Sequence, residues 1–189
     1  ALRRDYAERF DNAQEMLRRA SVVGREFDVD VLHLVCDLDD DGLIDALEAA
    51  ERAQLIEELH RSGERPGSPR FSFLHALIPH TLAESVSGLR RQRVHRRVAE
   101  ALVQLGADRL DELAPRIGRH FAEAGEWDRA AEYLLRAGDQ ANRLYAYGEA
   151  IADYEEALVI LREKKDEPRA ARTLMKLGSL YHAVLDYPR

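Results

Sequence analysis

The second half of the chain has apolar residues at helical spacing. From Leu110 onward they recur three or four positions apart in four successive segments, which is the period of one face of an α-helix. Gly125 separates the first two segments, and a charged stretch at 164–168 precedes the last. The segments begin at Leu110, Trp127, Tyr147 and Ala171. This pattern predicts four consecutive helices.

Small residues alternate with bulky ones on these predicted helices. Small residues let antiparallel helices approach closely, and aromatic side chains fill the gaps between them. We therefore interpret the aromatic residues as core packing, against the alternative of a ligand cage. Because similar segments follow one another, the pattern indicates a helical solenoid. The small residues include Ala130, Gly138, Ala150 and Gly178, and the aromatic ones are Trp127, Tyr147, Tyr154 and Tyr181.

The first half of the chain is less regular. A helical face runs from Leu2 to Ala20 and includes Phe10, and Gly24 is expected to end that helix. Residues 25–28 are expected to form a short connection. We interpret the apolar run 29–35 as a short helix, with a strand as the alternative at this length.

A third helix and a hairpin are predicted next. An aspartate at positions 39–41 caps the helix, whose apolar face extends toward Gln54. Residues 55–59 predict a first strand and residues 71–74 a return strand. The loop 60–69 between them contains two Gly, two Pro and two Ser. Three helices followed by a two-stranded hairpin is the winged-helix arrangement.

Two more helices connect the hairpin to the solenoid. Pro79 is tolerated only in a first helical turn, so a helix is expected from Leu77 or Ile78 to about Ser87. Gly88 is expected to break it, and residues 90–105 predict the next helix. We expect a mainly α chain with two domains, at residues 1–105 and 106–189.

Composition limits the classes of function. The net charge is −7 and the sequence pI is near 5.5, which argues against a dedicated nucleic-acid binder. The single cysteine, Cys36, excludes an internal disulfide and fits a reducing, cytoplasmic setting. No apolar run has membrane-spanning length and no signal peptide opens the chain. Because the chain starts within a helical pattern without Met, we expect it to be part of a longer protein.

Two segments of the solenoid carry a family resemblance. Residues 148–158, GEAIADYEEAL, resemble the second helix of a tetratricopeptide repeat, with Ala150, Tyr154 and Ala157 on its small/large/small signature. Residues 176–181, KLGSLY, resemble the first helix of such a repeat. The resemblance implies a tetratricopeptide-like solenoid of antiparallel helix pairs that binds a protein or peptide.

The order of segments 20–27, 43–47, 71–77 and 91–99 is similar to the region after the nucleotide-binding domain in bacterial STAND signalling ATPases. There an AAA-like ATPase precedes a winged-helix domain and helical repeats, often with a nucleotide cyclase or a DNA-binding module. The resemblance implies an upstream nucleotide-binding domain in the same protein, with ATP or ADP as its ligand. It implies no cofactor in this chain, which lacks a G-x-x-x-x-G-K-[ST] loop.

The same resemblance gives His75 a role. In STAND proteins a histidine after the last wing strand faces the bound nucleotide and helps to hold the ADP-bound form. His75 occupies that position by motif, so the resemblance implies a nucleotide sensor. The alternative is a histidine that caps the next helix or packs at a domain seam.

An acidic stretch fits the calcium-loop pattern D-x-D-x-D-G-x5-E. Its residues are Asp37, Asp39, Asp41 and Glu48, with Gly42 at the turn position. EF-hands usually occur in pairs, and no second such loop is present. We therefore interpret the aspartates as the acidic start of a helix and predict no metal site.

The run Arg90, Arg91, Arg93, Arg96 and Arg97 is a candidate partner surface. The alternative is a solvated helix face whose apolar side packs inward. The helix before the hairpin, which would enter the major groove in a DNA-reading winged helix, is acidic. Phosphate would repel it, so nucleic-acid binding through this unit is not expected.

We expect a regulatory role, with the repeats sensing a partner or ligand and the winged helix coupling them to the nucleotide-binding domain. No catalytic residue set is apparent, so this chain is not expected to be an enzyme, although the longer protein would be an ATPase or a cyclase. The alternative is a transcription regulator that uses the winged helix to bind DNA.

Overall fold

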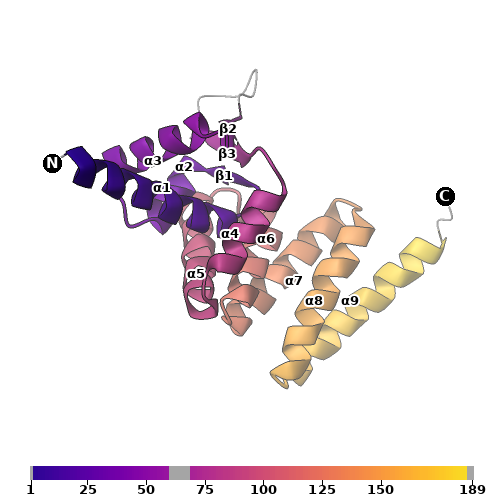
Figure 1. Cartoon of the computed structure of the whole chain (residues 1–189). Coiled ribbons are helices and arrows are strands. Elements are labelled where there is room, and N and C mark those ends of the chain that lie inside the picture. Colours follow the sequence, from indigo (N-terminus) through magenta and orange to yellow (C-terminus); the bar gives the residue numbers. More distant parts are fainter. Residues whose placement is uncertain (1, 60–68, 187–189) are drawn as a thin grey trace. The chain divides into compact units, whose positions relative to one another are not determined.

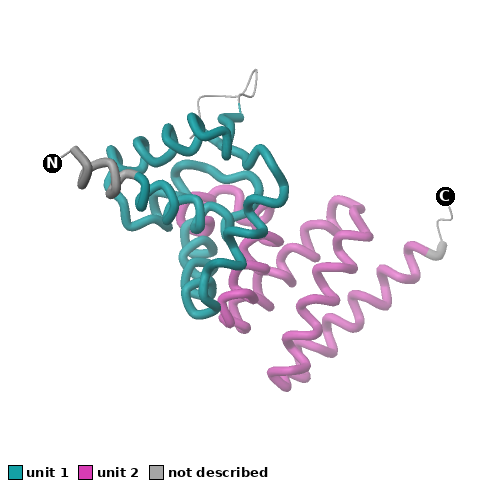
Figure 2. The backbone as a smooth tube through the Cα atoms, in the orientation of Figure 1, with its two compact units in different colours: residues 1–101 teal, residues 102–189 magenta. Residues whose placement is uncertain are grey.

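A computed structural model describes residues 2–59 and 69–186 of the chain. The chain divides into two compact units, residues 1–101 and 102–189 (Figure 2). It is mainly helical, as expected, with one small antiparallel sheet in the first unit. The expected boundary after Leu105 lies at the end of a helix that begins in the first unit.

The first unit is built from helices around that sheet (Figure 1). Helix α1 packs against α2, α3 and α4. The run at 29–35 is a helix, as expected, and not the alternative strand. The elements are α1 (Leu2–Val23), β1 (Glu26–Asp28), α2 (Val29–Val35), α3 (Asp40–Arg52), β2 (Ile56–Glu58), β3 (Arg70–Phe73), α4 (Leu77–Ser85) and α5 (Gly88–Leu105).

The sheet has three strands in the order β1-β3-β2, and both pairs are antiparallel. Strands β2 and β3 form the expected antiparallel pair, but residues 26–28, which were expected to be a short connection, form a third strand. Phe27 lies opposite Phe71, and its ring contacts that of Phe73 edge to face with centroids 5.4 Å apart. A three-residue strand shows no alternating pattern, and this one is held by its central buried aromatic side chain. Residues 60–68 of the expected loop at 60–69 lie outside the described part of the chain.

Specific residues fix the ends of the helices in this unit. Gly24 ends α1 with φ +139°, a conformation that side-chain-bearing residues rarely adopt. Asp39 caps α3 by accepting a hydrogen bond from the Gly42 amide at 2.9 Å. Gln54 lies beyond the helix with φ +56°, so its expected place on the apolar face was wrong. Phe10 shares the expected face of α1 with Ala13 and Leu17, but it is 63% exposed.

The break between α4 and α5 differs slightly from the prediction. Pro79 lies in the first turn of α4, as expected. Backbone N–H groups in that turn have no intrahelical acceptor, so proline, which lacks the N–H, loses no hydrogen bond there. The helix ends at Ser85, and Val86 is extended. Gly88 is the first residue of α5 and not the break itself, and the Ser87 carbonyl accepts a hydrogen bond from the Arg91 amide.

The second unit is a stack of helices joined by one kind of turn. Successive helices pack against each other, α6 on α7, α7 on α8 and α8 on α9. Gly125, Tyr145 and Lys165 each take a positive φ, between 58° and 77°, at the centre of the three connections. The turn therefore repeats every 20 residues. The helices are α6 (Leu110–Glu123), α7 (Trp127–Arg143), α8 (Tyr147–Glu163) and α9 (Glu167–Asp186).

Close packing between these helices depends on particular glycines. A Cβ on Gly138 would lie 2.6 Å from the ring of Tyr154, and one on Gly118 would lie 2.9 Å from Leu134. Gly178 has open space around it, so its predicted role in close packing was wrong. Of the aromatic residues expected between helices, Tyr154 is fully buried, whereas Trp127 is 38% and Tyr181 is 44% exposed.

Ion pairs link each helix of the stack to the next but one. Arg119 of α6 contacts Asp153 of α8 at 3.0 Å and Glu156 at 3.4 Å. Lys176 of α9 contacts Asp139 of α7. Asp153 is buried, and this burial raises the pKa of its carboxyl while the charge of Arg119 lowers it. The second unit is thus held both by packing and by paired charges.

Candidate functional site

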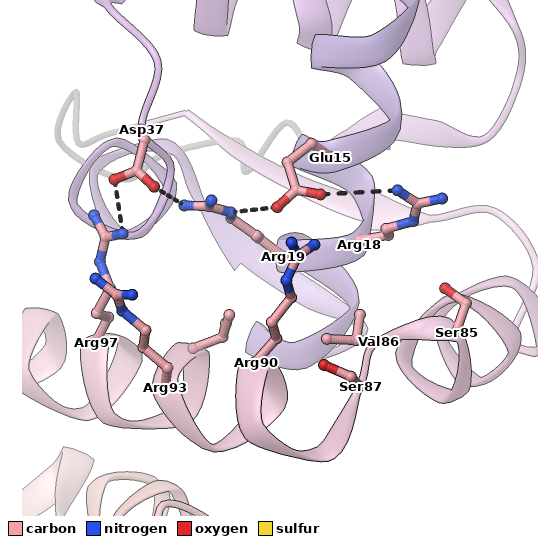
Figure 3. Close-up of a pocket in the computed structure, with 11 residues that line it drawn as sticks. Glu15, Arg18, Arg19, Asp37, Ser85, Val86, Ser87, Arg90, Arg93 and Arg97 are labelled. Carbon is pink, nitrogen blue, oxygen red and sulfur yellow. Dashed lines mark hydrogen bonds and ion pairs between the residues drawn. The ribbon is translucent and has the colours of Figure 1, made fainter.

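The first unit contains a polar pocket of about 780 Å³. It lies between α1, the end of α2, the end of α4 and the first turns of α5 (Figure 3). Two carboxylates, Glu15 and Asp37, and two serines, Ser85 and Ser87, line it. The remaining charged residues are five arginines, Arg18, Arg19, Arg90, Arg93 and Arg97. The pocket thus holds an excess of three positive charges in a chain whose net charge is −7.

Helix geometry brings three of these arginines to the pocket from the predicted basic run. Arg90, Arg93 and Arg97 are spaced i, i+3 and i+7, which places them on one face of α5. In Figure 3 Arg90 extends from α5 toward Arg19 of α1, whereas Arg97 extends toward Asp37 and Arg93 lies beside it. Arg91 and Arg96 do not line the pocket. The candidate partner surface is therefore split, with three of its arginines at the pocket and two elsewhere on the helix.

Two of the arginines are fixed at the inner end of the pocket. Asp37 accepts from Arg97 at 2.8 Å through Oδ1 and contacts Arg19 at 2.9 Å through Oδ2. Arg19 also donates to the Val35 carbonyl at 2.6 Å, and Arg97 donates to the Leu34 carbonyl at 3.0 Å. These carbonyls are at the C-terminal end of α2, where helical carbonyls lack intrahelical partners and the helix dipole is negative.

This arrangement changes the protonation of its neighbours. The hydrogen bonds from Arg97 and Arg19 lower the pKa of Asp37 below its usual value, so its carboxylate stays ionised. Cys36 is buried beside them, and burial raises the pKa of its thiol to about 11 in spite of the two guanidinium groups. A thiol of that pKa is mostly protonated at neutral pH and therefore a poor nucleophile.

The outer arginines are open to solvent. Arg90 and Arg93 are exposed, and neither has a hydrogen-bond or ion-pair partner among the described residues. Arg18 has one long contact, 3.8 Å to Glu15, and its side chain is 42% exposed. Glu15 itself already contacts Arg19 at 3.1 Å. The positive charge of the outer pocket is therefore not balanced by neighbouring carboxylates.

His75 lies away from this pocket. It is exposed in the bend between β3 and α4, and its carbonyl accepts a hydrogen bond from the Ile78 amide at 3.1 Å. The backbone of His75 thus contributes to the start of α4. Its side chain is open to solvent at the position that the family resemblance assigns to a nucleotide sensor.

The residues of the acidic motif have other partners. Asp37 binds arginines in the pocket, Asp39 caps α3, and Asp41 lies in the first turn of that helix. Glu48 lies on α3 at 3.7 Å from Arg52. Because α3 already begins at Asp40, the motif does not form an extended loop. Across residues 2–59 and 69–186, no group of three or more His, Cys, Asp or Glu side chains is arranged to hold a metal ion.

A second, apolar groove of about 710 Å³ lies between α1, α3 and α4. Phe10 and Leu17 of α1 line it together with Ile78 and Leu82 of α4. Helix α4 has no fully buried residue. The groove is thus an apolar surface that the first unit leaves uncovered.

Comparison of the chain with models of known protein families, with curated proteins and with solved structures gave no match. In the part of the chain that the structure describes, no helix combines the length and apolar character needed to cross a membrane.

Sequence reasoning found only part of the pocket. It named the run on α5 but missed Arg18 and Arg19, which lie on α1 far away in the sequence. The adjacent pair Arg18-Arg19 is a visible signal, but the helical period alone does not show which other helix it faces. It is Asp37, shared by Arg19 and Arg97, that connects the two sets.

Proposed function

We propose that this chain is a regulatory and protein-interaction part of a STAND-type signalling ATPase. In this proposal the first unit is a winged-helix-like adaptor to a nucleotide-binding domain of the same protein. The second unit is a tetratricopeptide-like scaffold that binds a protein or peptide. The element order α1-β1-α2-α3-β2-β3, with β3 between the other two strands, supports the adaptor assignment.

The observation that carries the proposal is the repeated turn of the second unit. Gly125, Tyr145 and Lys165 create the same connection at intervals of 20 residues, so each helix stacks on the previous one in the same way. Such stacks present extended surfaces for partner binding. A helix pair here takes 40 residues, longer than the roughly 34 of a tetratricopeptide repeat, so the repeats are variants of that pattern.

The apolar groove of the first unit supports the coupling role. An uncovered apolar surface lined by Phe10, Leu17, Ile78 and Leu82 is typical of a site that contacts another protein surface. We assign it to the nucleotide-binding domain, because α4 directly follows the bend that holds His75. A domain that covers α4 would therefore also approach His75.

Coupling can be tested in the whole protein by measuring the release of a fluorescent ADP analogue. Leu82→Asp places a charge in the groove, so we expect ADP release to become faster by about tenfold. Leu89→Asp is the matched control, because Leu89 is 83% exposed and does not line the groove. Equal release rates in wild type and Leu82→Asp would contradict the coupling role, as would a coding region without a P-loop upstream of Ala1.

The DNA-binding alternative is tested separately by electrophoretic mobility shift of this chain with duplex DNA. Glu48 and Glu51 are exposed on α3, so we expect no shift at micromolar protein in about 150 mM salt. A sequence-specific shift at nanomolar protein would favour the transcription regulator instead.

A further inference from the structure

We propose that the arginine pocket of the first unit binds a small anion that carries two linked phosphates. This inference does not depend on the regulatory role proposed above. It starts from the five guanidinium groups that line one pocket against two carboxylates. The volume of about 780 Å³ is within the range of small-molecule sites, which is roughly 300–1,000 Å³.

The inner end of the pocket is preorganised. Arg19 and Arg97 are held by Asp37 and by the carbonyls of Val35 and Leu34, and the Arg19 side chain is only 17% exposed. A guanidinium group has five N–H donors, so each of these arginines retains donors beyond those already used. Donors fixed before binding lose little conformational entropy when the ligand arrives.

The outer end of the pocket supplies the unbalanced charge. Arg90 and Arg93 extend from α5 and have no partner among the described residues, and Arg18 holds only one long contact (Figure 3). Like charges close together repel one another, and an anion between them removes that repulsion. Hydrogen bonds from guanidinium to phosphate oxygens are short, charge-assisted and often bidentate.

The start of α5 adds a second source of positive potential. Ser87 lines the pocket, and the first helical N–H groups after it have no intrahelical acceptor. The first turn of α5 contains no acidic residue. The N-terminal end of a helix favours anions because of these free N–H groups and the helix dipole. The helix end at Ser87 thus adds to the positive potential of the arginines, which carry the proposal.

Charge matching selects the ligand class. A phosphate monoester carries about 1.5–2 negative charges at neutral pH. The excess of three positive charges in the pocket exceeds that of one phosphate and suits two linked ones. A duplex backbone is extended, whereas these arginines converge on one concave space. We therefore assign the site to a diphosphate group, either as the free ion or as part of a nucleotide.

The test is isothermal titration calorimetry of the chain with inorganic pyrophosphate, orthophosphate and ADP at about 50 mM salt. We expect pyrophosphate to bind at least about tenfold more tightly than orthophosphate. If ADP and pyrophosphate bind with equal affinity, the site recognises the diphosphate group alone. If ADP binds more tightly than pyrophosphate, the ligand is a nucleotide. Absence of pyrophosphate binding at millimolar concentration would overturn the proposal, as would a hexa-aspartate peptide that binds more tightly than pyrophosphate.

Two double variants separate a site from general charge attraction. Arg90→Ala/Arg93→Ala removes two pocket arginines that have no described partner, so it should fold normally and weaken pyrophosphate binding at least about tenfold. Arg91→Ala/Arg96→Ala removes the same charge from the same helix outside the pocket and should change binding less than about twofold. Circular dichroism checks that both variants fold. Equal losses in the two variants would overturn the proposal.

Discussion

The two units use arginine in different ways. In the second unit Arg119, Arg136, Arg143 and Arg169 each contact a carboxylate on a different helix, so their charge is balanced within the stack. In the pocket of the first unit, two carboxylates face five arginines, and both carboxylates are already engaged by Arg19. Arginines of both units thus connect helices, but only the pocket of the first unit also contains arginines, Arg90 and Arg93, that have no partner among the described residues.

The difference shows how charge balance separates a structural arginine from a binding one. A paired arginine between helices fixes their contact and gains little from a further anion. An arginine next to other arginines is stabilised when an anion arrives, because each repulsion becomes an attraction. The net charge of −7 does not reveal a local excess of arginine, because it is summed over the whole chain.

The largest expected change in stability comes from the close contact between two helices of the second unit at Gly138. Gly138→Ala places a Cβ 2.6 Å from the ring of Tyr154, and we expect a loss of about 1–3 kcal/mol in the free energy of unfolding. Gly178→Ala is the matched control in an open position and should gain roughly 0.5–1 kcal/mol through helix propensity. Urea unfolding measures both. Equal effects of the two substitutions would show that the stack is not closely packed at Gly138.

A smaller effect is expected from removing one carboxylate in each unit. Asp37→Ala leaves Arg19 and Arg97 without their shared acceptor, and we expect a loss of about 1–2 kcal/mol, because Arg19 is mostly buried although Asp37 is not. Asp111→Ala removes the shared partner of Arg136 and Arg143, which are more exposed, and should cost about 0–1 kcal/mol. Denaturant titration compares them. If Asp111→Ala lost more unfolding free energy than Asp37→Ala, the conclusion that Arg19 and Arg97 are the more firmly held arginines would be contradicted.

The pH dependence of the Asp37 contribution should be smaller still. Its folded-state pKa lies below the unfolded value, which is about 3.9, so its stabilisation is complete above that pH. It is lost as the pH falls through the lower, folded-state pKa. The difference in unfolding free energy between wild type and Asp37→Asn should be constant near neutral pH and shrink in acid. A difference that grows on acidification would contradict the arginine contacts of Asp37.

Much of the fold follows from local sequence patterns. The helical period located the helices of the second unit, and Pro79 fixed the start of α4. The strand β1 was missed because three residues carry no alternation and Phe27 is recognised only through its partners on β3. Ala130 and Ala150 contributed to the predicted solenoid, and Ala170, 20 residues further on, continues their spacing; all three are buried.

The pocket was less predictable than the fold. The i, i+3, i+7 spacing on α5 is readable, but the facing of α1 and α5 depends on tertiary packing. Likewise, Gly138 and Gly178 have similar helical surroundings in the sequence, yet one contacts an aromatic ring and the other faces open space. Which neighbour a side chain meets is decided by the arrangement of distant segments.

The most direct test of the difference between the units is an NMR titration with pyrophosphate that observes the Nε–Hε signals of the arginines. We expect signals of Arg90 and Arg93 to shift together with those of Arg97 and Arg19, because these groups line the pocket. Signals of Arg119 and Arg143, whose charge is paired between helices, should stay in place. Shifts spread equally over both units, or found only in the second, would contradict the account.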